Sequence, residues 1–451
     1  MSVYRHPEFL TTEDEPRNRI RCPIHGFVHY SENERRVIDH PLFRRLRHIR
    51  QLALTEYVYP GAVHTRFEHS LGVMEVATQA FDCLAVKHGD ILEESFKTVD
   101  AFEKNPLALA RQYLRLAALL HDVGHASFSH AAEKAVNEGI GHEALTLLIV
   151  RQQDFLAREL EVTFGDACSE MVAQIIEGGR DLPPQLHVLH DLVSGEMDAD
   201  RTDYLLRDSH HCGVDYGKFD YWRMLECIEL QRNPLGGLDV ALHRDGLHAF
   251  EALILARYQM NTQVYYHRLR RIYDLYLVEY HRALGEDAPD TPEQVVAETD
   301  VTMMNRITQD AQVGEGDRGK WAKRILRRDH HRVVHETGVD ANAIDLRRSK
   351  EVLSALAQKF AEQEFLHDVS KGKIHMLVTE EDKSDEGLVN LPLIGKDKPD
   401  GYIGYESQVL RKIPREFQCA RIFSNLTRGD KELRKDITEF AAKQWQERGG
   451  R

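Results

Sequence analysis

Residues 107–130 read LALARQYLRLAALLHDVGHASFSH, a segment that leads into an adjacent histidine and aspartate, His121 and Asp122. The mostly apolar residues 114–120 predict a buried helix, and Gly124 permits a sharp turn just beyond its end. A buried carboxylate is costly unless it is paired or binds a metal. The segment therefore predicts one of two arrangements: a histidine that caps the helix C-terminus with the aspartate as its partner, or a metal site.

The composition is that of a globular protein. The 451 residues include 59 Lys plus Arg and 73 Asp plus Glu, and the net charge of −14 disfavours nucleic acid as the main partner because acidic surfaces repel phosphate. Hydrophobic residues make up 42% of the chain, which is too high for general disorder. The six cysteines form no CxxC pair, and no segment approaches the roughly 18 apolar residues of a membrane helix. We expect a cytoplasmic protein with reduced thiols and no membrane partner.

Helical periodicity dominates the first 370 residues of the chain. Apolar residues recur every three or four positions, which is typical of helices with one buried face. The predicted helices span residues 67–87, 107–121, 142–160, 198–209, 246–283, 292–308 and 342–366. A Pro and a Gly among alternating apolar residues also predict a short hairpin at 20–30.

After about residue 370 the pattern changes from helices to strands. Strand-like segments lie at 373–379, 388–394 and 418–424, and a charged helix is predicted at 430–447. We therefore predict a mainly α fold with a small C-terminal α+β appendage. The expected regions are an N-terminal tail at 1–19, a helical core with a helical extension at 20–370, and an α+β region at 371–451.

Two further metal-ligand candidates stand on predicted helices whose other residues face the core. They are His69 in the string HTRFEHSLGV and Asp200 in the string MDADRTDYLLRD. Together with His121 and Asp122 they supply two imidazoles and two carboxylates. Such a set suits a divalent ion such as manganese, iron, zinc, nickel or magnesium, and it leaves positions for water and a substrate oxygen.

The helix that carries Asp200 has two more polar residues on the same face. Asp200, Tyr204 and Asp208 are spaced by four residues and share one side of that helix. A group bound at Asp200 would therefore also meet an aromatic ring and a second carboxylate. The alternative for Asp208 is a surface ion pair with Arg201 or Arg207.

The order His69, His121-Asp122, Asp200 resembles the H…HD…D signature of the HD-domain metal-dependent phosphohydrolases. The flanking strings YPGAVHTRFEHSLGV, LLHDVGHASFSH and DADRTDYLLRDSHHCGV look like those of the dNTP triphosphohydrolases related to the vertebrate SAM- and HD-domain enzyme and to bacterial dGTPase-like enzymes. The resemblance runs from about residue 20 to 340 and includes PIHG at 23–26. It implies an α-helical HD core, and we expect no SAM domain before residue 20.

The resemblance implies a reaction and the residues that perform it. Its metal ligands fall on His69, His121, Asp122 and Asp200. A metal-bound water would attack the α-phosphorus of a dNTP and release a deoxynucleoside and inorganic triphosphate. The acid/base candidates implied by the resemblance are His125 and His130, supported by the pair His142 and Glu143. For each histidine, the alternative is a hydrogen-bonded core residue.

The resemblance also implies substrate contacts. Arg66 and Arg257 match arginines that contact the triphosphate, and Arg201 replaces a family lysine. Arg257 could instead be an ordinary surface arginine of its helix. The expected contacts to the sugar, with Tyr265 bordering the base or sugar, are Gln51, Leu52, Tyr204, Asp208 and Tyr265.

Regulation is implied less completely. Asp39, Arg47 and Arg268 match residues of the nucleotide effector sites that lie between subunits of the vertebrate enzyme. The sequence departs from that pattern at Asn18, Arg44 and Asp245. An acidic residue in place of a phosphate-binding lysine would repel a nucleotide effector, which argues against activation. A homo-oligomer, dimer or tetramer, is still expected.

Two other functions remain open. The first keeps the metal site and changes the substrate, as in an HD-domain nucleotidase or phosphodiesterase that acts on other nucleotides. Such an enzyme would not need three arginines directed at three phosphates. The second is a non-catalytic, nucleotide-sensing oligomer. A missing ligand would favour that function, and all four ligand positions are occupied by metal-binding residue types.

Overall fold

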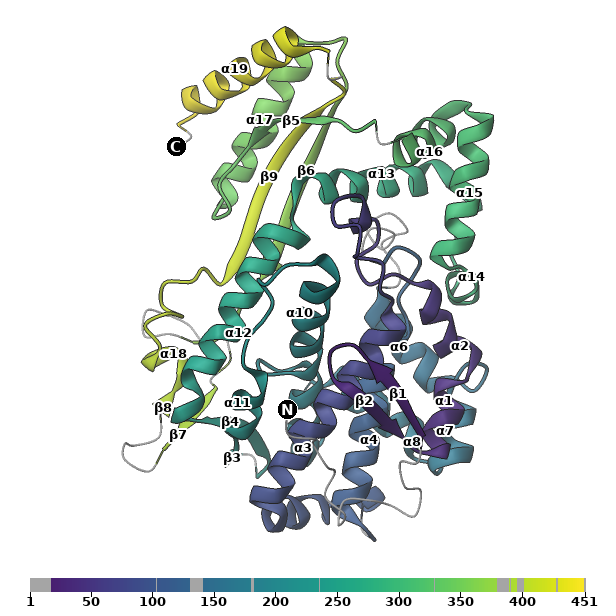
Figure 1. Cartoon of the computed structure of the whole chain (residues 1–451), viewed down its shortest axis with the longest axis vertical. Helices are drawn as coiled ribbons and strands as arrows, with labels where there is room; N and C mark the ends of the chain where they lie inside the picture. Colours follow the sequence, from purple (N-terminus) through teal and green to yellow (C-terminus); the bar gives the residue numbers. More distant parts are fainter. Residues whose placement is uncertain are drawn as a thin grey trace.

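The structure is a computed structural model that describes residues 18–102, 104–129, 141–179, 182–234, 236–327, 329–378, 389, 391–395, 401–426 and 429–449. Within these residues the fold is mainly α, and a smaller α+β part extends from the helical body at the C-terminal end (Figure 1). Both features confirm the predicted fold class. None of the described helices is long and apolar enough to cross a membrane. Most of the predicted N-terminal tail lies outside the described residues.

Three helices form the centre of the helical body: α3 (Arg66–Phe96), α4 (Pro106–Leu120) and α10 (Ala199–Cys212). Helix α3 packs against both α4 and α10, and its first five turns are almost wholly buried. The helices predicted at 67–87, 107–121 and 198–209 are therefore confirmed. Their packing brings the start of α3, the end of α4 and the start of α10 to one place.

The ends of these helices follow from local sequence. Pro106 occupies the first turn of α4, where its fixed φ is compatible with a helix. Asp198 caps α10 by accepting a hydrogen bond from the Arg201 N–H at 2.7 Å. Gly213 ends α10 in the left-handed conformation, with φ 69°, which glycine adopts without a steric penalty.

Shorter helices and single turns surround this centre. The helices are α1 (Glu32–Ile38), α2 (Pro41–Arg44), α6 (His142–Arg151), α7 (Ala157–Phe164), α8 (Cys168–Glu177), α9 (His187–Ser194) and α11 (Tyr221–Glu226). The 3-10 turns are η2 (Arg45–His48), η3 (Thr55–Tyr57), η4 (Asp100–Phe102), η5 (Pro184–Leu186), η6 (Arg244–Gly246) and η8 (Gly285–Asp287). The single helix predicted at 142–160 is wrong. It divides into α6 and α7 because the exposed polar residues 152–154 give the core face no apolar contact.

The long helix predicted at 246–283 is also divided. It consists of α12 (Leu247–Met260), a π turn η7 (Asn261–Tyr265) and α13 (Arg268–Leu284). His267 starts the second helix, because its Nδ1 accepts a hydrogen bond from the Leu269 N–H at 3.3 Å. Apolar periodicity continues through the break, so the sequence pattern does not reveal it.

A helical extension follows α13. It contains α14 (Pro292–Ala297), α15 (Asp300–Val313) and α16 (Gly316–Arg327), and α16 packs against both α13 and α15. The helix predicted at 292–308 is interrupted where Thr299 caps α15. A second core cluster, separate from the one around α3, lies between these helices and includes Tyr276, Tyr280 and Trp321.

The described residues form three small sheets. The predicted hairpin at 20–30 is confirmed as β1 (Asn18–Cys22) and β2 (Gly26–Tyr30), which pair antiparallel. The second sheet has the order β3 (Ile228–Arg232), β4 (Leu238–His243), β7 (Pro392–Ile394), β8 (Gly401–Tyr402), and its β4–β7 pair is parallel. The third sheet has the order β5 (Arg332–Glu336), β9 (Glu416–Ser424), β6 (Phe365–Lys373).

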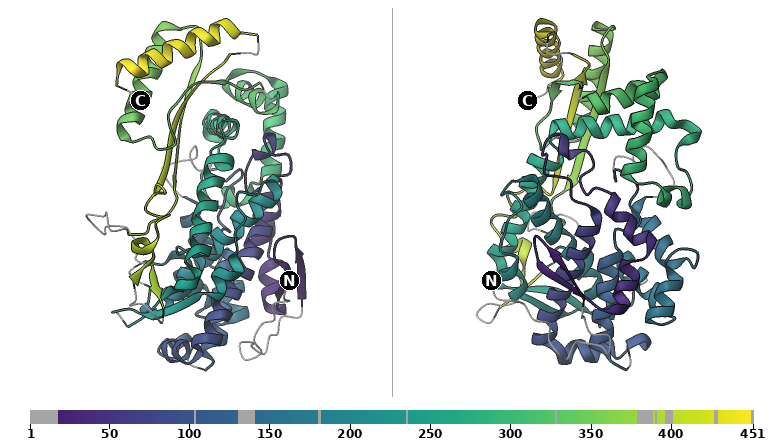
Figure 2. Two further views of the ribbon diagram at one scale, coloured as in Figure 1. Left: turned by 60° about the vertical axis from the view of Figure 1, so that its left-hand side comes forward. Right: turned by 45° about the vertical axis from the view of Figure 1, so that its right-hand side comes forward.

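The appendage is built on the third sheet. Figure 2 shows β6 and β9 running together from the helical body out to α17 (Ala343–Lys359) and α19 (Lys431–Glu447), which pack against each other. A further short helix, α18 (Ile403–Glu406), follows β8. The helix predicted at 342–366 ends early, and the strand predicted at 373–379 begins early, because residues 365–373 pair along their whole length with the distant β9. The predicted domain boundary near residue 370 falls within β6 and stays a prediction.

Candidate metal centre

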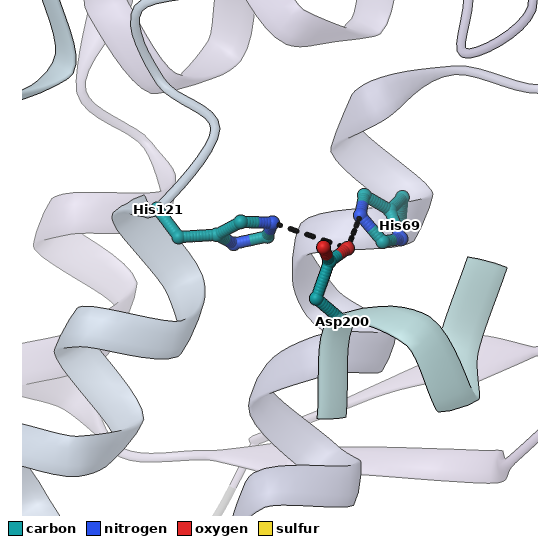
Figure 3. Close-up of side chains that lie close together, drawn as sticks. All are labelled: His69, His121 and Asp200. Atoms are coloured by element: carbon teal, nitrogen blue, oxygen red, sulfur yellow. Dashed lines mark ion pairs between the residues drawn. The ribbon is translucent and has the colours of Figure 1, made fainter. Parts of the chain in front are cut away.

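Three predicted ligands from three helices converge. His69 lies in the first turn of α3, His121 at the C-terminal end of α4, and Asp200 in the first turn of α10. Figure 3 shows the carboxylate of Asp200 between the two imidazole rings. Its Oδ1 lies 3.0 Å from His69 Nε2 and 3.7 Å from His121 Nε2. One potential ligand atom from each residue lies within 4.8 Å of the others, so this group could hold a metal ion.

The imidazole nitrogens are arranged as metal binding requires. The Nδ1 of His69 faces Asp203 Oδ2 at 2.8 Å, and the Nδ1 of His121 faces the Ala118 carbonyl at 2.8 Å. A carboxylate and a carbonyl only accept, so each Nδ1 donates a proton and each Nε2 is the nitrogen that is directed toward Asp200. Both Nε2 atoms are buried and make no hydrogen bond. A divalent cation between them would replace the protons on these two nitrogens and bind their lone pairs, so the residues fit the ion that the sequence predicts.

Asp122 lies beside this group. Its Oδ2 contacts Arg66 and lies 3.7 Å from His69 Nε2, and its Oδ1 lies 3.5 Å from His121 Nε2. Burial alone would raise the pKa of Asp122, but His121 and Arg66 hold it well below its usual value. The four predicted ligands are therefore in one place.

Neighbouring carboxylates favour the protonated forms of His69 and His121. Burial would lower the pKa of His69, but Asp200 and Asp203 raise it to about 10. Burial likewise opposes charge on His121, and its neighbours Asp122 and Asp200 raise its pKa. Three carboxylates, those of Asp122, Asp200 and Asp203, thus attract positive charge to this position, and a metal would displace the protons that the imidazoles hold.

Two of the acid/base candidates, His125 and His142, lie close to Asp122. His125 Nε2 is 3.2 Å from Asp122 Oδ1, and the rings of His125 and His142 stack with centroids 4.0 Å apart. Asp122, His125 and His142 form a second group of metal-ligating atoms within 4.8 Å. Glu143 is exposed at the first turn of α6, and His130 lies outside the described residues.

The loop that follows His125 has an unusual backbone. Phe128 and Ser129 both have positive φ angles, 54° and 51°, which are uncommon for residues other than glycine. The Phe128 N–H donates to Asp300 Oδ1 at 2.7 Å, and the Arg50 N–H donates to Asp300 Oδ2 at 2.8 Å. Asp300 at the start of α15 therefore ties two loops near the candidate centre to the helical extension.

The predicted sugar contacts surround Asp208. Its Oδ2 accepts a hydrogen bond from the Tyr265 hydroxyl at 2.7 Å, and its Oδ1 lies 2.7 Å from His64 Nε2. The rings of Tyr204 and Tyr265 meet edge to face with centroids 6.1 Å apart. Asp208 is buried and, among the described side chains, does not pair with Arg201 or Arg207, so the surface ion pair is wrong.

Gln51 and Leu52 reach the same region through His64. The Gln51 N–H donates to the His64 carbonyl at 3.1 Å, and Leu52 is buried. The Gln51 side-chain oxygen is buried and has no hydrogen-bond partner. Sequence reasoning missed His64, although it stands in the string that carries His69.

The three predicted phosphate-binding arginines differ in how they are engaged. Arg66 donates from Nε to Ser129 Oγ at 2.8 Å and contacts Asp122. Arg201 contacts Asp198 at 3.2 Å and the Gly195 carbonyl. Arg257 has a buried Nη1 without a hydrogen-bond partner.

Arg201 and Arg257 share one electrostatic environment. Burial raises the pKa of Asp198 to about 7, and both guanidinium groups act against that rise. Both also lower the pKa of Tyr204, which burial raises to about 12. Positive charge from α10 and α12 therefore collects beside Asp200.

The predicted effector-site residues lie at the surface. Asp39 caps the end of α1 and is exposed, with Arg35 Nε at 3.3 Å. Arg47 is exposed in η2, with its guanidinium 3.5 Å from the centre of the Phe67 ring. Partial burial and Arg44 lower the pKa of Arg47, and Asp39 acts against that fall. Arg268 is exposed at the first position of α13. Asp39 and Arg47 thus share a surface, and Arg268 belongs to a different element.

Comparisons with known proteins agree with this arrangement. Residues 66–208 match the HD domain, and residues 219–389 match an HD associated region. An uncharacterized protein of Methanocaldococcus jannaschii is 34% identical over 258 residues, which cover 56% of this chain and 47% of that protein. The deoxynucleoside triphosphate triphosphohydrolase SAMHD1 of Gallus gallus is 31% identical over 230 residues, which cover 45% of this chain and 35% of that protein.

A solved structure shares the fold over nearly the whole chain. It is a hypothetical protein from Aquifex aeolicus, with a TM-score of 0.73 and 25% identity, covering 94% of this chain and 99% of that one. The chain spans about half the length of the curated relatives that it matches first. The segment that carries His69, His121, Asp122 and Asp200 is the one that matches, and the chain therefore contains an HD domain.

Proposed function

We propose that this protein is a metal-dependent phosphohydrolase that hydrolyses dNTPs to deoxynucleosides and inorganic triphosphate. The observation that carries the proposal is the pair of buried Nε2 atoms of His69 and His121, which make no hydrogen bond and face one oxygen of Asp200. The choice of substrate is supported by the similarity to the SAMHD1 triphosphohydrolase and by the aromatic and carboxylate groups around Asp208.

In this proposal His69, His121, Asp122 and Asp200 hold a divalent ion. When bound, the ion would lower the pKa of water and neutralise phosphate charge. His125 lies against Asp122 and stacks on His142, so it can hold or donate a proton beside the reacting phosphorus. A water oxygen forms a bond to the α-phosphorus as the bond between that phosphorus and the 5′-oxygen breaks. Of His125 and His130, one would accept the proton of the water and the other would supply the proton of the leaving 5′-hydroxyl.

The remaining residues bind and orient the substrate. Arg257 has an unsatisfied buried donor, and Arg201 lies near it, so both can bind phosphate oxygens. Asp208 would accept a hydrogen bond from the 3′-hydroxyl. Tyr265 and Leu52 would pack against the sugar, where an additional 2′-hydroxyl would find neither space nor a partner.

The proposed assembly is a homo-oligomer. Asp39 and Arg47 lie on an exposed surface that a second subunit or a nucleotide effector could reach. Arg268 would contribute from α13. These assignments rest on the sequence resemblance.

Product analysis tests the proposal. Each dNTP, and GTP for comparison, is incubated with the purified protein and Mn²⁺, Mg²⁺, Zn²⁺, Ni²⁺ or Fe²⁺, and the products are separated by ion chromatography. Triphosphate and deoxynucleoside are expected as first products, and Asp200→Ala should lose both bound metal and turnover while keeping its helical circular dichroism. Pyrophosphate or monophosphate as the first product would contradict the proposal, and so would the absence of product with all five ions. Hydrolysis of nucleoside monophosphates in the same assay would favour a nucleotidase.

A further inference from the structure

A fully buried hydrogen-bond network lies behind His69, on the side away from Asp200. Its centre is Asp203, one turn from Asp200 on α10, whose side chain has no exposed surface. Asp203 Oδ2 contacts His69 Nδ1 at 2.8 Å, and Asp203 Oδ1 contacts His25 Nε2 at 2.6 Å. The two oxygens of one carboxylate thus join a candidate metal ligand to a histidine that comes 44 residues earlier in the numbering.

Arg207 completes the network. Its Nε and Nη2 contact the two oxygens of Asp203, each at 2.8 Å, and its Nη2 also lies 3.3 Å from Cys22 Sγ. This two-point contact with a guanidinium pairs Asp203 as a carboxylate, and a carboxylate accepts hydrogen bonds from both imidazoles without donating to either.

The hairpin turn places His25 in this network. Cys22 and Gly26 are the last paired residues of β1 and β2, and Gly26 has φ 83°. Gly26 permits the turn, which directs the His25 side chain inward until none of it is exposed. The ring also meets Tyr221 edge to face at 6.0 Å. The PIHG string of the sequence is therefore a turn that delivers an imidazole to Asp203.

We propose that His25 and Asp203 are positioning residues of the metal centre. Asp203 fixes the ring orientation and the tautomer of His69, so that Nδ1 carries the proton and Nε2 faces the metal. His25 holds Asp203 from the other side, with Arg207 balancing its charge. Partners of this kind typically change metal affinity about 10- to 100-fold when they are removed. The inference rests on the metal site of the proposed function.

Metal titration of full-length variants tests the inference. His25→Phe keeps the aromatic ring and removes the donor, and His25→Gln keeps an N–H near the position of Nε2. Asp203→Asn removes the carboxylate charge. The matched control is His88→Phe, because His88 Nε2 contacts Glu229 Oε2 at the same 2.6 Å but lies 19 residues beyond His69 on α3. Mn²⁺ binding is followed by the electron paramagnetic resonance of the free ion, and Co²⁺ by its visible absorption.

The expected order of affinities is specific. His25→Phe should weaken Mn²⁺ binding about tenfold and alter the Co²⁺ absorption, and Asp203→Asn should weaken binding about 10- to 100-fold. His25→Gln should recover most of the affinity, and His88→Phe should match the wild type. Urea unfolding of the metal-free variants identifies any variant that is merely destabilised, and His25→Phe keeps the test valid if Asp203→Asn does not fold.

Two failures are distinguishable. If the wild type binds neither Mn²⁺ nor Co²⁺ and releases no triphosphate with any of the five ions, the proposed function fails and the inference falls with it. If the wild type binds metal and produces triphosphate, but His25→Phe shows unchanged Mn²⁺ affinity and an unchanged Co²⁺ spectrum, only the inference is overturned. Equal loss in His25→Phe and His25→Gln would also overturn it, because the donated hydrogen bond would then not be the cause.

Discussion

Asp208 illustrates how much one side chain can do at the scale of a residue. Both of its oxygens are engaged, one by His64 and one by Tyr265, although it lies two turns from Asp200 on the same helix. A buried carboxylate held on both sides is a fixed acceptor. Its orientation does not depend on the metal, so substrate contact and metal ligation can be separated experimentally on one face of α10.

Asp208→Asn should reduce kcat/KM for dGTP about tenfold to a hundredfold while leaving the metal content unchanged. The amide cannot accept at both positions, and a hydroxyl that loses its partner costs about 1–3 kcal/mol. Steady-state kinetics together with metal analysis of the purified variant measure both quantities. A variant that lost its metal would show that Asp208 belongs to the ligand shell instead.

The residues of the candidate centre were predictable to different degrees. The sequence strings around the four predicted ligands contain residue types that indicate metal binding. These ligands are His69, His121, Asp122 and Asp200. Asp203 and His25 carry no such signal, because 178 positions separate them and no spacing rule joins a hairpin turn to a helix. Their contact depends on the packing of α3 against both β2 and α10.

At the scale of elements, the approach of α3 to α10 depends on a glycine. A Cβ added at Gly72 would overlap Asp203 Oδ1 and Arg207 Nη2. Gly72 lies one turn after His69, so the absence of a side chain lets the Asp203 network reach the candidate ligand. A second glycine of the same helix, Gly89, would place a Cβ at 4.0 Å from Leu107 Cδ1, an ordinary contact.

Gly72→Ala should therefore weaken Mn²⁺ binding and lower the free energy of unfolding, because Asp203 and Arg207 must move. Gly89→Ala should bind metal like the wild type and leave stability unchanged or raise it by about 0.5–1 kcal/mol. Urea denaturation and metal titration of both variants provide the comparison. Similar behaviour of the two variants would mean that the contact between α3 and α10 can adjust.

Helix α15 acts on the centre through its first residue. Asp300 accepts from the backbone N–H groups of Phe128 and Arg50, and Asp300→Ala would leave both donors without their partner. Each orphaned buried donor costs about 1–3 kcal/mol, so we expect a stability loss of about 2 kcal/mol or more and a lower kcat. Thermal unfolding and steady-state kinetics measure these effects. The control is Asp317→Ala at an exposed position of α16, which should change neither.

Element types were more predictable than element ends. Apolar periodicity predicts the helices α3, α4 and α10, because the apolar residues that recur every three or four positions are those that pack in the core. The π turn at Asn261–Tyr265 does not, because apolar residues continue on both sides of it. That turn places Tyr265 beside Asp208. A predicted sugar-contact residue therefore stands on a turn that the sequence pattern did not predict.

At the scale of the whole molecule, stability in acid depends on buried neutral histidines. His281 of α13 is buried, and neither of its ring nitrogens makes a hydrogen bond. Burial and the nearby Arg306 lower its pKa from 6.5 to about 4. The unfolded chain therefore binds this proton more readily, so stability is complete above pH 6.5 and falls as the pH approaches 4.

His281→Phe should flatten this dependence. At pH 5 the wild-type histidine costs about 2 kcal/mol relative to neutral pH, a cost that the phenylalanine variant does not incur. Urea unfolding at pH 7 and pH 5 measures the difference between the two proteins. His248→Phe, at a side chain that is 91% exposed, should keep the wild-type dependence. An equal fall in stability for His281→Phe would assign the acid sensitivity to other groups.

The arrangement of the sheets was the part of the molecule least open to prediction. Strand β9 lies between β5 and β6, and β7 adds to β4, so partners in each sheet come from distant parts of the chain. A short run of strand-forming residues predicts that a strand exists. It does not predict which strand it pairs with, because the partners depend on the surfaces that the helices leave uncovered. This is why β6 was expected several residues too late.

The parallel contact between β4 and β7 means that the second sheet can be completed only late in synthesis. During synthesis, β3 and β4 leave the ribosome and can form their hairpin long before Pro392 has been translated. Until then, β4 presents an unpaired edge that could join another nascent chain. A fragment released from the ribosome after β4 but before residue 392 would therefore keep that edge open.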